Sequence, residues 1–337
     1  MLKKISLLSL SLVISLIIIE IFLSFFFPQD LTGSFRTYGK NGLLLNAKNK
    51  VVPVFHLGKK VSNYTFGEFH NRKYDLEKSD NKILILGDSF TFGWLLKDED
   101  TFIYKLNENI DNFSFINSAA GGWGTSDQLK YLMSFCKTVN PKYIVVFLNT
   151  FDLERSTRSN LFLLDDDKIK ESNNQISKLK IFLENSKIYN FSIENFHIIN
   201  FLKKIFLSSS FSIQNNRSVE INDNNTNGEN QKNNHSDFYR KLFLKFKEEV
   251  KICNSKVIII NLGWYNYNTS STNTDEFIKN NINFFNKNFN FIDLNYDLIE
   301  IQENYTKFTI KNDDHPNKLG NEYLYEIIYK KLFPLIN

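Results

Sequence analysis

The sequence of 337 residues is poor in cysteine, proline and histidine, and neither sign of charge is in large excess. Its two cysteines, Cys136 and Cys253, are too few and too far apart for a disulfide framework or a metal site, although one bridge between them stays open. A net charge of +4 is too small to indicate nucleic acid as a partner. With 42% hydrophobic and 23% charged residues, the chain has the composition of an ordinary folded protein.

The amino terminus carries a long apolar run over residues 5–27, which follows Lys3 and Lys4. At about 1.5 Å per residue this run can cross a hydrocarbon core of roughly 30 Å. We therefore predict an uncleaved membrane anchor over residues 1–28, with the lysines inside and the rest of the chain outside the cytoplasm. Glu20 interrupts the run near its outer end, where it can reach the interface or a partner. A cleaved signal peptide would be shorter and would end at small residues, and a buried helix would show a polar stripe.

Five short apolar runs follow a lead-in over residues 29–80, which lacks periodicity and should hold one or two short strands. The runs are β-branched or aromatic and mostly not alternating, as in buried parallel strands, and they cover residues 82–87, 113–118, 142–148, 256–262 and 289–293. Helical patterns lie between them. We therefore expect one α/β domain over residues 81–337, built as a three-layer, doubly wound parallel sheet.

Residues 151–237 interrupt this alternation and predict an insertion in the domain. Within it, residues 193–207 show a helical pattern that could pack on the core. Residues 208–237 are rich in Asn, Ser and charge and have few aliphatic side chains. Such a segment buries too little surface to offset the entropy of ordering it, so we predict a disordered surface loop there.

The first predicted strand ends abruptly in Gly87-Asp88-Ser89, within the segment KILILGDSFTFG. A serine at the carboxyl end of a buried strand, followed by the start of a helix, is where α/β enzymes place a nucleophile. A hydroxyl becomes a competent nucleophile only with a base and with donors for the developing oxyanion. Ser89 is therefore the leading candidate, and its partners must come from elsewhere in the chain.

His315 is the candidate base, because it follows Asp313 and Asp314 in KNDDHPNKLG, a polar loop before the last predicted helix. That loop should lie at the same edge of the sheet as Ser89. One of the two carboxylates would fix the tautomer at Nδ1 and leave Nε2 facing the serine. A solvated helix cap is the alternative for DDHPN alone. The other histidines lie in the lead-in without a nearby carboxylate or on the expected surface of the insertion: His56, His70, His197 and His235.

Two loops at the carboxyl ends of the second and third predicted strands could supply oxyanion donors. The glycines of NSAAGGWGT, residues 117–125, can bring backbone amides close to a bound carbonyl, although they can equally serve a turn. Asn149 in NTFD offers a side-chain amide in the same region, although a lone Asn in a loop is more often a turn residue.

Together these segments resemble the SGNH hydrolase family, also called GDSL-type esterases, whose sequence blocks occur in this order. GDSFTFGWLLKDEDTF is similar to the first block, which implies that Ser89 is the nucleophile. NSAAGGWGTSDQ is similar to the second, which implies a Gly122 amide in the oxyanion hole, and DDHPNKLG is similar to the block that holds the acid and base. The resemblance runs from about Ser62, where SNYTFGEF is similar to a lead-in of membrane-anchored bacterial members, and it implies a flavodoxin-like fold.

The chain departs from the family pattern at two positions. The third block usually reads Gly-x-Asn-Asp, and Phe151 takes the place of its oxyanion Asn, so Asn149 is the candidate substitute. The usual Asp lies three residues before the catalytic histidine, where this chain has Asn312. We expect Asp313 to orient the histidine, with Asp314 as the alternative, because Asp314 would point away on an extended loop.

The resemblance implies a serine esterase that hydrolyses O-acyl esters, most simply acetyl esters, or an O-acyltransferase, without metal or cofactor. An anchored location favours an acylated small molecule or a cell-surface polysaccharide as substrate. From another functional class, the alternative is a weakly active or inactive SGNH-fold protein that binds a glycan, which is consistent with Phe151 and Asn312.

Overall fold

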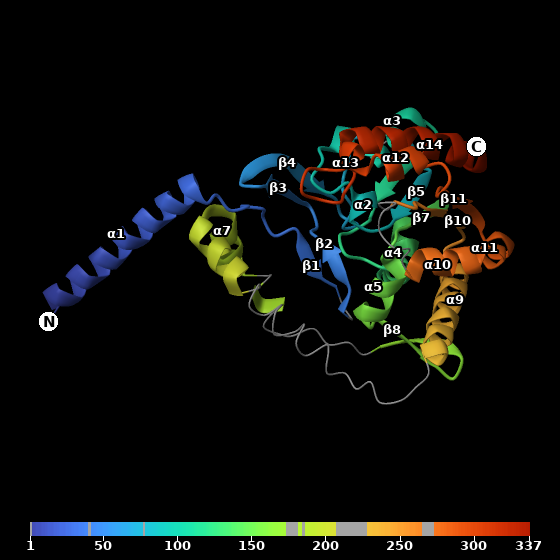
Figure 1. The fold of residues 1–337 in the computed structure, drawn as a ribbon, viewed down its shortest axis with the longest axis horizontal. Helices are drawn as coiled ribbons and strands as arrows, with labels where there is room; N and C mark the ends of the chain where they lie inside the picture. The colour runs from blue at the N-terminus through green and yellow to red at the C-terminus, as the bar shows by residue number, and fades with distance from the viewer. Residues whose placement is uncertain are drawn as a thin grey trace.

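The computed structural model describes residues 2–39, 42–76, 78–172, 181–183, 186–206, 228–264 and 273–337. A five-stranded parallel sheet lies at the centre of the folded part (Figure 1). In spatial order its strands are β11 (Asn290–Asp293), β10 (Lys256–Asn261), β7 (Tyr143–Leu148), β5 (Lys82–Leu86) and β6 (Ser114–Asn117). All four neighbouring pairs are parallel, so the predicted doubly wound sheet is confirmed, and its strand order is flavodoxin-like.

Helices cover both faces of this sheet, because alternate strand residues point to opposite faces and both sets are apolar. In β5, Ile83 and Ile85 belong to one buried cluster, and Leu84 and Leu86 belong to the other. The first cluster includes residues of α3 (Phe102–Asn109), α12 (Ile299–Glu303), α13 (Tyr305–Phe308) and α14 (Lys318–Ile336). The second includes residues of α4 (Thr125–Val139), α9 (Gly228–Ile252), α10 (Asn273–Asn280) and α11 (Ile282–Asn288). Figure 1 shows these two helical layers on either side of the strands.

The lead-in contains more regular structure than the sequence predicted. We expected one or two short strands, but the structure has two antiparallel hairpins, made by β1 (Arg36–Tyr38) with β2 (Leu44–Asn46) and by β3 (Lys50–His56) with β4 (Lys59–Phe66). In the second hairpin the buried side chains alternate along each strand, at Val52 and Val54 and at Tyr64 and Phe66. Pro53 lies between the first two and obscures the strand pattern in the sequence.

The insertion is also more ordered than predicted at its carboxyl end. It contains α5 (Asp152–Ser159), a hairpin of β8 (Phe162–Asp165) and β9 (Lys168–Glu171), α7 (Lys187–Asn195) and a further helix over residues 197–206. The predicted disordered loop falls mostly on residues 208–227, which lie outside the described residues. Its last part was wrong, because α9 already begins at Gly228.

A disulfide joins Cys136 in α4 to Cys253, directly after α9, which settles the bridge that the sequence left open. At the amino terminus, α1 (Leu2–Phe26) projects away from the folded part (Figure 1). Its stretch from Lys4 to Phe26 is long and apolar enough to cross a membrane, with a mean hydropathy of 2.6, and none of its most apolar window is buried.

Candidate active site

Ser89 lies just after β5, as the first residue of the short helix α2 (Ser89–Phe92). Asp88 caps this helix, because its Oδ1 accepts a hydrogen bond of 2.9 Å from the amide of Phe90. Gly87 is required before the turn, since a Cβ there would lie 2.3 Å from a side-chain oxygen of α2. The strand therefore delivers Ser89 to the carboxyl edge of the sheet, where 7% of its surface stays exposed.

His315 faces Ser89 from a loop between α13 and α14. Its Nε2 lies 2.7 Å from Ser89 Oγ. The loop is closed by a β-bridge between Thr309 and Pro316 and by a hydrogen bond of 2.9 Å from the Ile310 amide to the His315 carbonyl. The predicted meeting of the two loops is therefore present in the geometry, although the catalytic roles of the two side chains stay a prediction.

Asp313 holds the imidazole from the other side. Its Oδ1 is hydrogen-bonded to Nδ1 of His315 and also accepts from the His315 amide at 2.8 Å. Burial alone raises the pKa of Asp313, but the hydrogen bonds and charge of His315 outweigh this, so the pKa lies below its ordinary value. Asp314 is exposed, and its carbonyl accepts from the Tyr305 hydroxyl at 3.0 Å. Asn312, at the usual position of the family acid, is also exposed, with a left-handed φ of 63°. The carboxylate that is hydrogen-bonded to the ring is therefore that of Asp313 and not that of Asp314.

Aromatic side chains cover the imidazole. The ring centroids of Phe90 and His315 are 4.6 Å apart, and those of Trp94 and His315 are 6.2 Å apart. Phe90 belongs to α2 and Trp94 to the turn after it, so the segment that carries Ser89 also shields the His315 ring from water. A less hydrated site strengthens the interactions between the charged groups inside it.

Arg72 of the lead-in fixes the turn after α2 and was missed by the sequence analysis. It is fully buried, and its guanidinium donates to the carbonyls of Phe92, Gly93 and Leu96 at 2.7 to 2.9 Å. Its Nε pairs with Asp98 at 2.7 Å. Four bonds from one planar group hold this turn to the lead-in, so the lead-in is part of the active-site scaffold. A lone arginine outside any motif gives no sequence signal of this role.

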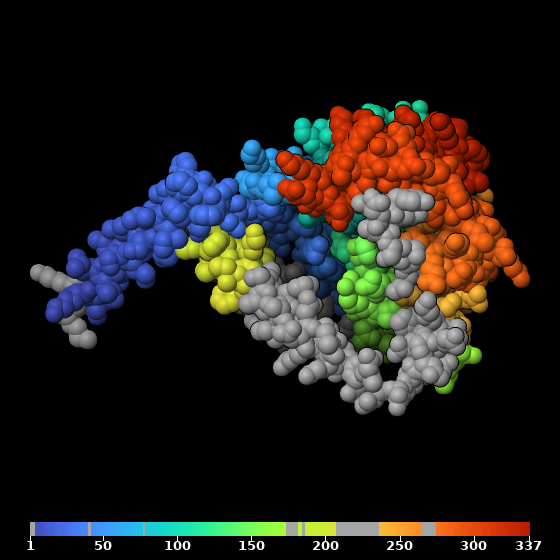
Figure 2. Space-filling model, in the orientation of Figure 1, coloured from blue at the N-terminus to red at the C-terminus, as the bar shows by residue number. Residues whose placement is uncertain are grey.

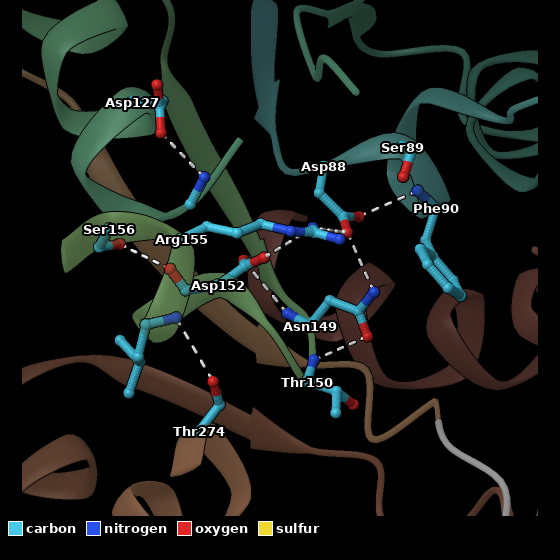
Figure 3. Close-up of polar contacts among 12 residues, drawn as sticks. Asp88, Ser89, Phe90, Asp127, Asn149, Thr150, Asp152, Arg155, Ser156 and Thr274 are labelled. Atoms are coloured by element: carbon cyan, nitrogen blue, oxygen red, sulfur yellow. Dashed lines mark hydrogen bonds and ion pairs between the residues drawn. The ribbon is translucent and has the colours of Figure 1, made fainter. Parts of the chain in front are cut away.

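The side chain of Asn149 is turned toward Asp88. Its Nδ2 donates to Asp88 Oδ2 at 3.0 Å, its Oδ1 accepts from the Thr150 amide at 2.8 Å, and 1% of its surface is exposed (Figure 3). Phe151, at the usual position of the oxyanion Asn, is 45% exposed. The role of Asn149 as an oxyanion donor stays a prediction, but the hydrogen bonds give it a different task, which is to hold Asp88.

A buried polar network lies beneath Ser89 and joins the ends of β5 and β7 (Figure 3). Asp88 Oδ2 accepts from Arg155 at 2.7 Å as well as from Asn149. Asp152 accepts from Gln128 at 3.1 Å and from the Asn149 amide at 3.2 Å. Burial and the nearby charge of Asp88 raise the pKa of Asp152 well above its ordinary value. Arg155 also lies 3.8 Å from Asp152, so the network fixes the residue next to Ser89 through the Arg155 ion pair and the hydrogen bond from Asn149.

The glycine loop after β6 lies beside Ser89. A Cβ on Gly121 would lie 3.8 Å from Ser89 Cβ and 3.1 Å from a terminal nitrogen of Arg36. Gly122 has a left-handed φ of 81°, which strains other residues, although a Cβ there would meet open space. The peptide bond that carries the Gly122 amide therefore begins at Gly121, which lies beside Ser89. An oxyanion role for the Gly122 amide requires this proximity. Arg36 of β1 is a second residue that no sequence motif indicated.

A cavity of about 610 Å³ adjoins these residues. The lead-in forms one wall with Phe35, Arg36 and His56. Trp94, whose amide donates to the Ser89 carbonyl at 3.1 Å, also lines the cavity, and Asp313 reaches it from the loop that carries His315. The insertion forms the opposite wall, through Tyr189, Ile193, Asn200 and Lys203. Two segments outside the central sheet therefore flank an open cavity, which meets the candidate site at Asp313, whereas Ser89 and His315 are not among its lining residues.

The remaining histidines make other contacts. His56 lines the cavity, His70 Nδ1 is 2.7 Å from the Asn46 carbonyl, and His197 Nδ1 accepts from the Gln29 amide at 2.9 Å. The side chain of His235 lies outside the described part of the chain. Over that part, no group of three or more His, Cys, Asp or Glu side chains is placed to hold a metal ion.

A scan of protein-family models and a search of curated proteins find no match to this chain. Among solved structures it is similar to TesA, at 10% identity over 76% of this chain and 100% of that chain, with a TM-score of 0.45. It is similar to the psychrotrophic esterase EstA from Pseudoalteromonas sp., at 12% identity over 76% and 99% of the two chains, with a TM-score of 0.43. It is also similar to the acetyl xylan esterase AlAXEase, at 14% identity over 76% and 100%, with a TM-score of 0.40.

The chain has an SGNH-like fold. Its five parallel strands have the flavodoxin-like order, and Ser89 lies directly after β5, at the carboxyl edge of the sheet.

Proposed function

We propose that this chain is a serine esterase of the SGNH type, which hydrolyses O-acyl esters. The contact that supports the proposal most is the 2.7 Å distance between Ser89 Oγ and His315 Nε2, with Asp313 bonded to the other ring nitrogen. An alcohol next to an imidazole that is itself held by a carboxylate is the arrangement that activates serine for acyl transfer.

The three side chains divide the reaction between them. His315 takes the proton of Ser89 as the oxygen attacks the ester carbonyl, and Asp313 holds the tautomer and stabilises the imidazolium. The tetrahedral intermediate collapses when His315 returns the proton to the leaving alcohol, which forms an acyl-serine. Water then attacks this ester while His315 accepts a proton from it, and the acid is released with Ser89 restored.

Arg36 is a further candidate for the side-chain donor in this proposal. The side-chain amide of Asn149 is hydrogen-bonded to Asp88, and Phe151 carries no donor in its side chain. By contrast, a Cβ on Gly121 would lie 3.1 Å from a terminal nitrogen of Arg36 and 3.8 Å from Ser89 Cβ, so the guanidinium lies on the side of Gly121 that faces Ser89. A cation here, together with the backbone amides of Ser89 and Gly122, stabilises negative charge as it develops on the carbonyl oxygen. One such donor is typically worth about 10²- to 10³-fold in rate.

The location proposed for the enzyme is the extracytoplasmic face of a membrane, with α1 as a single-pass anchor. Lys3 and Lys4 precede the span and favour a cytoplasmic amino terminus. The disulfide between Cys136 and Cys253 supports this orientation, because such bonds persist in oxidising compartments and are rare in the cytosol.

An acylated glycan or a smaller acyl ester is the proposed substrate class. The cavity beside Asp313 combines aromatic side chains, Trp94 and Tyr189, with the cations Arg36 and Lys203, and its volume of about 610 Å³ can hold a sugar unit. Acyl transfer to a sugar hydroxyl is the second candidate: an acceptor whose hydroxyl reaches the acyl-serine would give its proton to His315 Nε2 in place of water.

Hydrolysis of p-nitrophenyl acetate by the full chain in detergent micelles tests the proposal. Ser89→Ala should abolish turnover, whereas the matched control Ser134→Ala, at an exposed position of α4, should retain it. Equal rates for the unchanged chain and Ser89→Ala would remove the enzyme proposal and leave a glycan-binding protein. If an acceptor glycan is added and more acetylated sugar than free acetate is formed, the protein is a transferase.

A further inference from the structure

Glu20 of α1 is hydrogen-bonded to the start of the helix over residues 197–206. Its Oε1 accepts from the His197 amide at 2.6 Å, and its Oε2 accepts from the Ile198 amide at 2.9 Å. The Gln29 amide, just beyond the span, donates to Nδ1 of His197 at 2.9 Å. One carboxylate therefore satisfies two amides that the first turn of a helix leaves unpaired. The span and the insertion are joined at this point.

The position of Glu20 along α1 determines how deep this contact lies in a membrane that α1 spans. α1 continues from Glu20 to Phe26, so at about 1.5 Å per residue the contact lies roughly 9 Å before the end of the helix. With α1 in a bilayer, the first turn of the helix over residues 197–206 is held at or below the edge of the hydrocarbon core. A segment at that depth lies in the interface and not in bulk water.

The insertion presents its apolar side chains outward. On α7, Ile188 and Phe191 are spaced by three residues and are 80% and 60% exposed, whereas Ile193 is 4% exposed and Glu194 pairs with Lys50 of the lead-in at 3.3 Å. A helix that packs on a protein surface in water has the opposite arrangement. Figure 2 shows this segment, in yellow, beside the end of α1.

Other exposed apolar and basic side chains near the end of α1 are also suited to a membrane interface. Leu202 is 43% exposed on the next helix, and Phe25 and Phe26 are 78% and 69% exposed at the adjoining end of α1. Lys187 and Lys204 are exposed among these apolar residues, as on segments that bind anionic headgroups. Apolar side chains that protrude between lysines, next to a membrane span, are the features of an interfacial helix.

We propose that residues 186–206 lie in the interface of the membrane that α1 spans, with Ile188, Phe191 and Leu202 in contact with lipid. This inference rests on the proposed anchoring by α1. The insertion is then a second membrane-binding element, and the cavity that it walls through Tyr189 and Lys203 opens next to the bilayer.

Quenching of a fluorophore by lipids that carry a doxyl group tests this arrangement. The full chain, reconstituted in phosphatidylcholine and phosphatidylglycerol vesicles, is labelled with NBD at one introduced cysteine: Leu12→Cys in α1, Ile188→Cys in α7, or Leu163→Cys in β8, which is 49% exposed and serves as the control. The native cysteines are paired and do not react. We expect similar quenching at Leu12 and Ile188 and little at Leu163.

The outcomes separate the two proposals. If the label at Leu12 is strongly quenched and the label at Ile188 is quenched as weakly as the label at Leu163, the proposal of an interfacial segment is wrong and the proposal of an anchor stands. Weak quenching at Leu12 would overturn the anchor and the inference with it. Self-quenching between labels at Ile188, without quenching by lipid, would assign this face to a second copy of the chain. Glu20→Leu should reduce quenching at Ile188 but not at Leu12, whereas Glu20→Gln, which keeps an acceptor, should reduce it less.

Discussion

Exchange of Asp313 for Asn tests the orientation of the catalytic base with little change in shape. In the unchanged chain Asp313 Oδ1 accepts from both Nδ1 and the backbone amide of His315. In Asp313→Asn the carbonyl can keep the bond to the amide, but the NH₂ group then faces Nδ1 as a donor. That arrangement favours the tautomer with the proton on Nε2, which can no longer accept the proton of Ser89.

The expected magnitude follows from this change of tautomer. The same exchange in a Ser-His-Asp triad lowers kcat by about 10⁴-fold, which is about 5.5 kcal/mol of activation free energy. Asp314→Asn is the matched control, because Asp314 is exposed and only its backbone carbonyl is bonded, so we expect a change within about twofold. The pKa of Asp313 is lowered, so its carboxylate stays ionised from about pH 5 upward and the defect should persist across that range.

The assay is the steady-state hydrolysis of p-nitrophenyl acetate by both variants between about pH 5 and 9, with melting temperatures as a check on folding. An Asp313→Asn variant that is folded and loses less than about tenfold in kcat would refute the assigned role. A larger loss in Asp314→Asn than in Asp313→Asn would move the orienting role to Asp314.

Three further substitutions address the rest of the site. Arg36→Met should lower kcat/KM for the same ester by about 10²- to 10³-fold, whereas Arg158→Met, which removes a likewise exposed guanidinium from α5, should change it little. Equal kcat/KM values for Arg36→Met and the unchanged chain would exclude the oxyanion role. Arg155→Met should lower the free energy of unfolding by about 3–5 kcal/mol, since Asp88 is left buried without its ion pair; a loss as small as that of Arg158→Met would contradict this. Burial raises the pKa of Asp127 to about 7, so between about pH 4 and 7 the folded state holds a proton that the unfolded state releases. The free energy of unfolding should therefore fall as the pH rises from about 4 to about 7. Asp127→Asn should make that free energy, measured by urea unfolding, depend less on pH.

The sequence predicted the elements that follow from local pattern. The strand predicted over residues 82–87 is β5, and α4 is one of the helices predicted between the apolar runs, because an unbroken apolar run and a 3.6-residue period each depend only on neighbouring residues. The contact between Ser89 and His315 was also predictable, since parallel strands bring their carboxyl ends to one edge.

The missed features depend on contacts between distant segments. Arg36 and Arg72 reach the site from the lead-in, and nothing near them in sequence indicates their partners. The hydrogen bond from Asn149 to Asp88 was not predicted either, because the need of Asp88 for donors arises only once both side chains are buried. The disulfide joins residues 117 apart in sequence, and only the packing of α4 against α9 brings them together.

The connection between the span and the first strand is short. Only residues 27–35 separate α1 from β1, which limits even a fully stretched linker to roughly 30 Å, and Gln29 is fastened to His197 on the way. With α1 embedded, such a tether keeps the serine within a thin layer above the bilayer. For the proposed esterase, encounters with substrate are then set by how many esters pass through that layer per unit of membrane area. Molecules dissolved farther out stay beyond its reach until they diffuse to the surface.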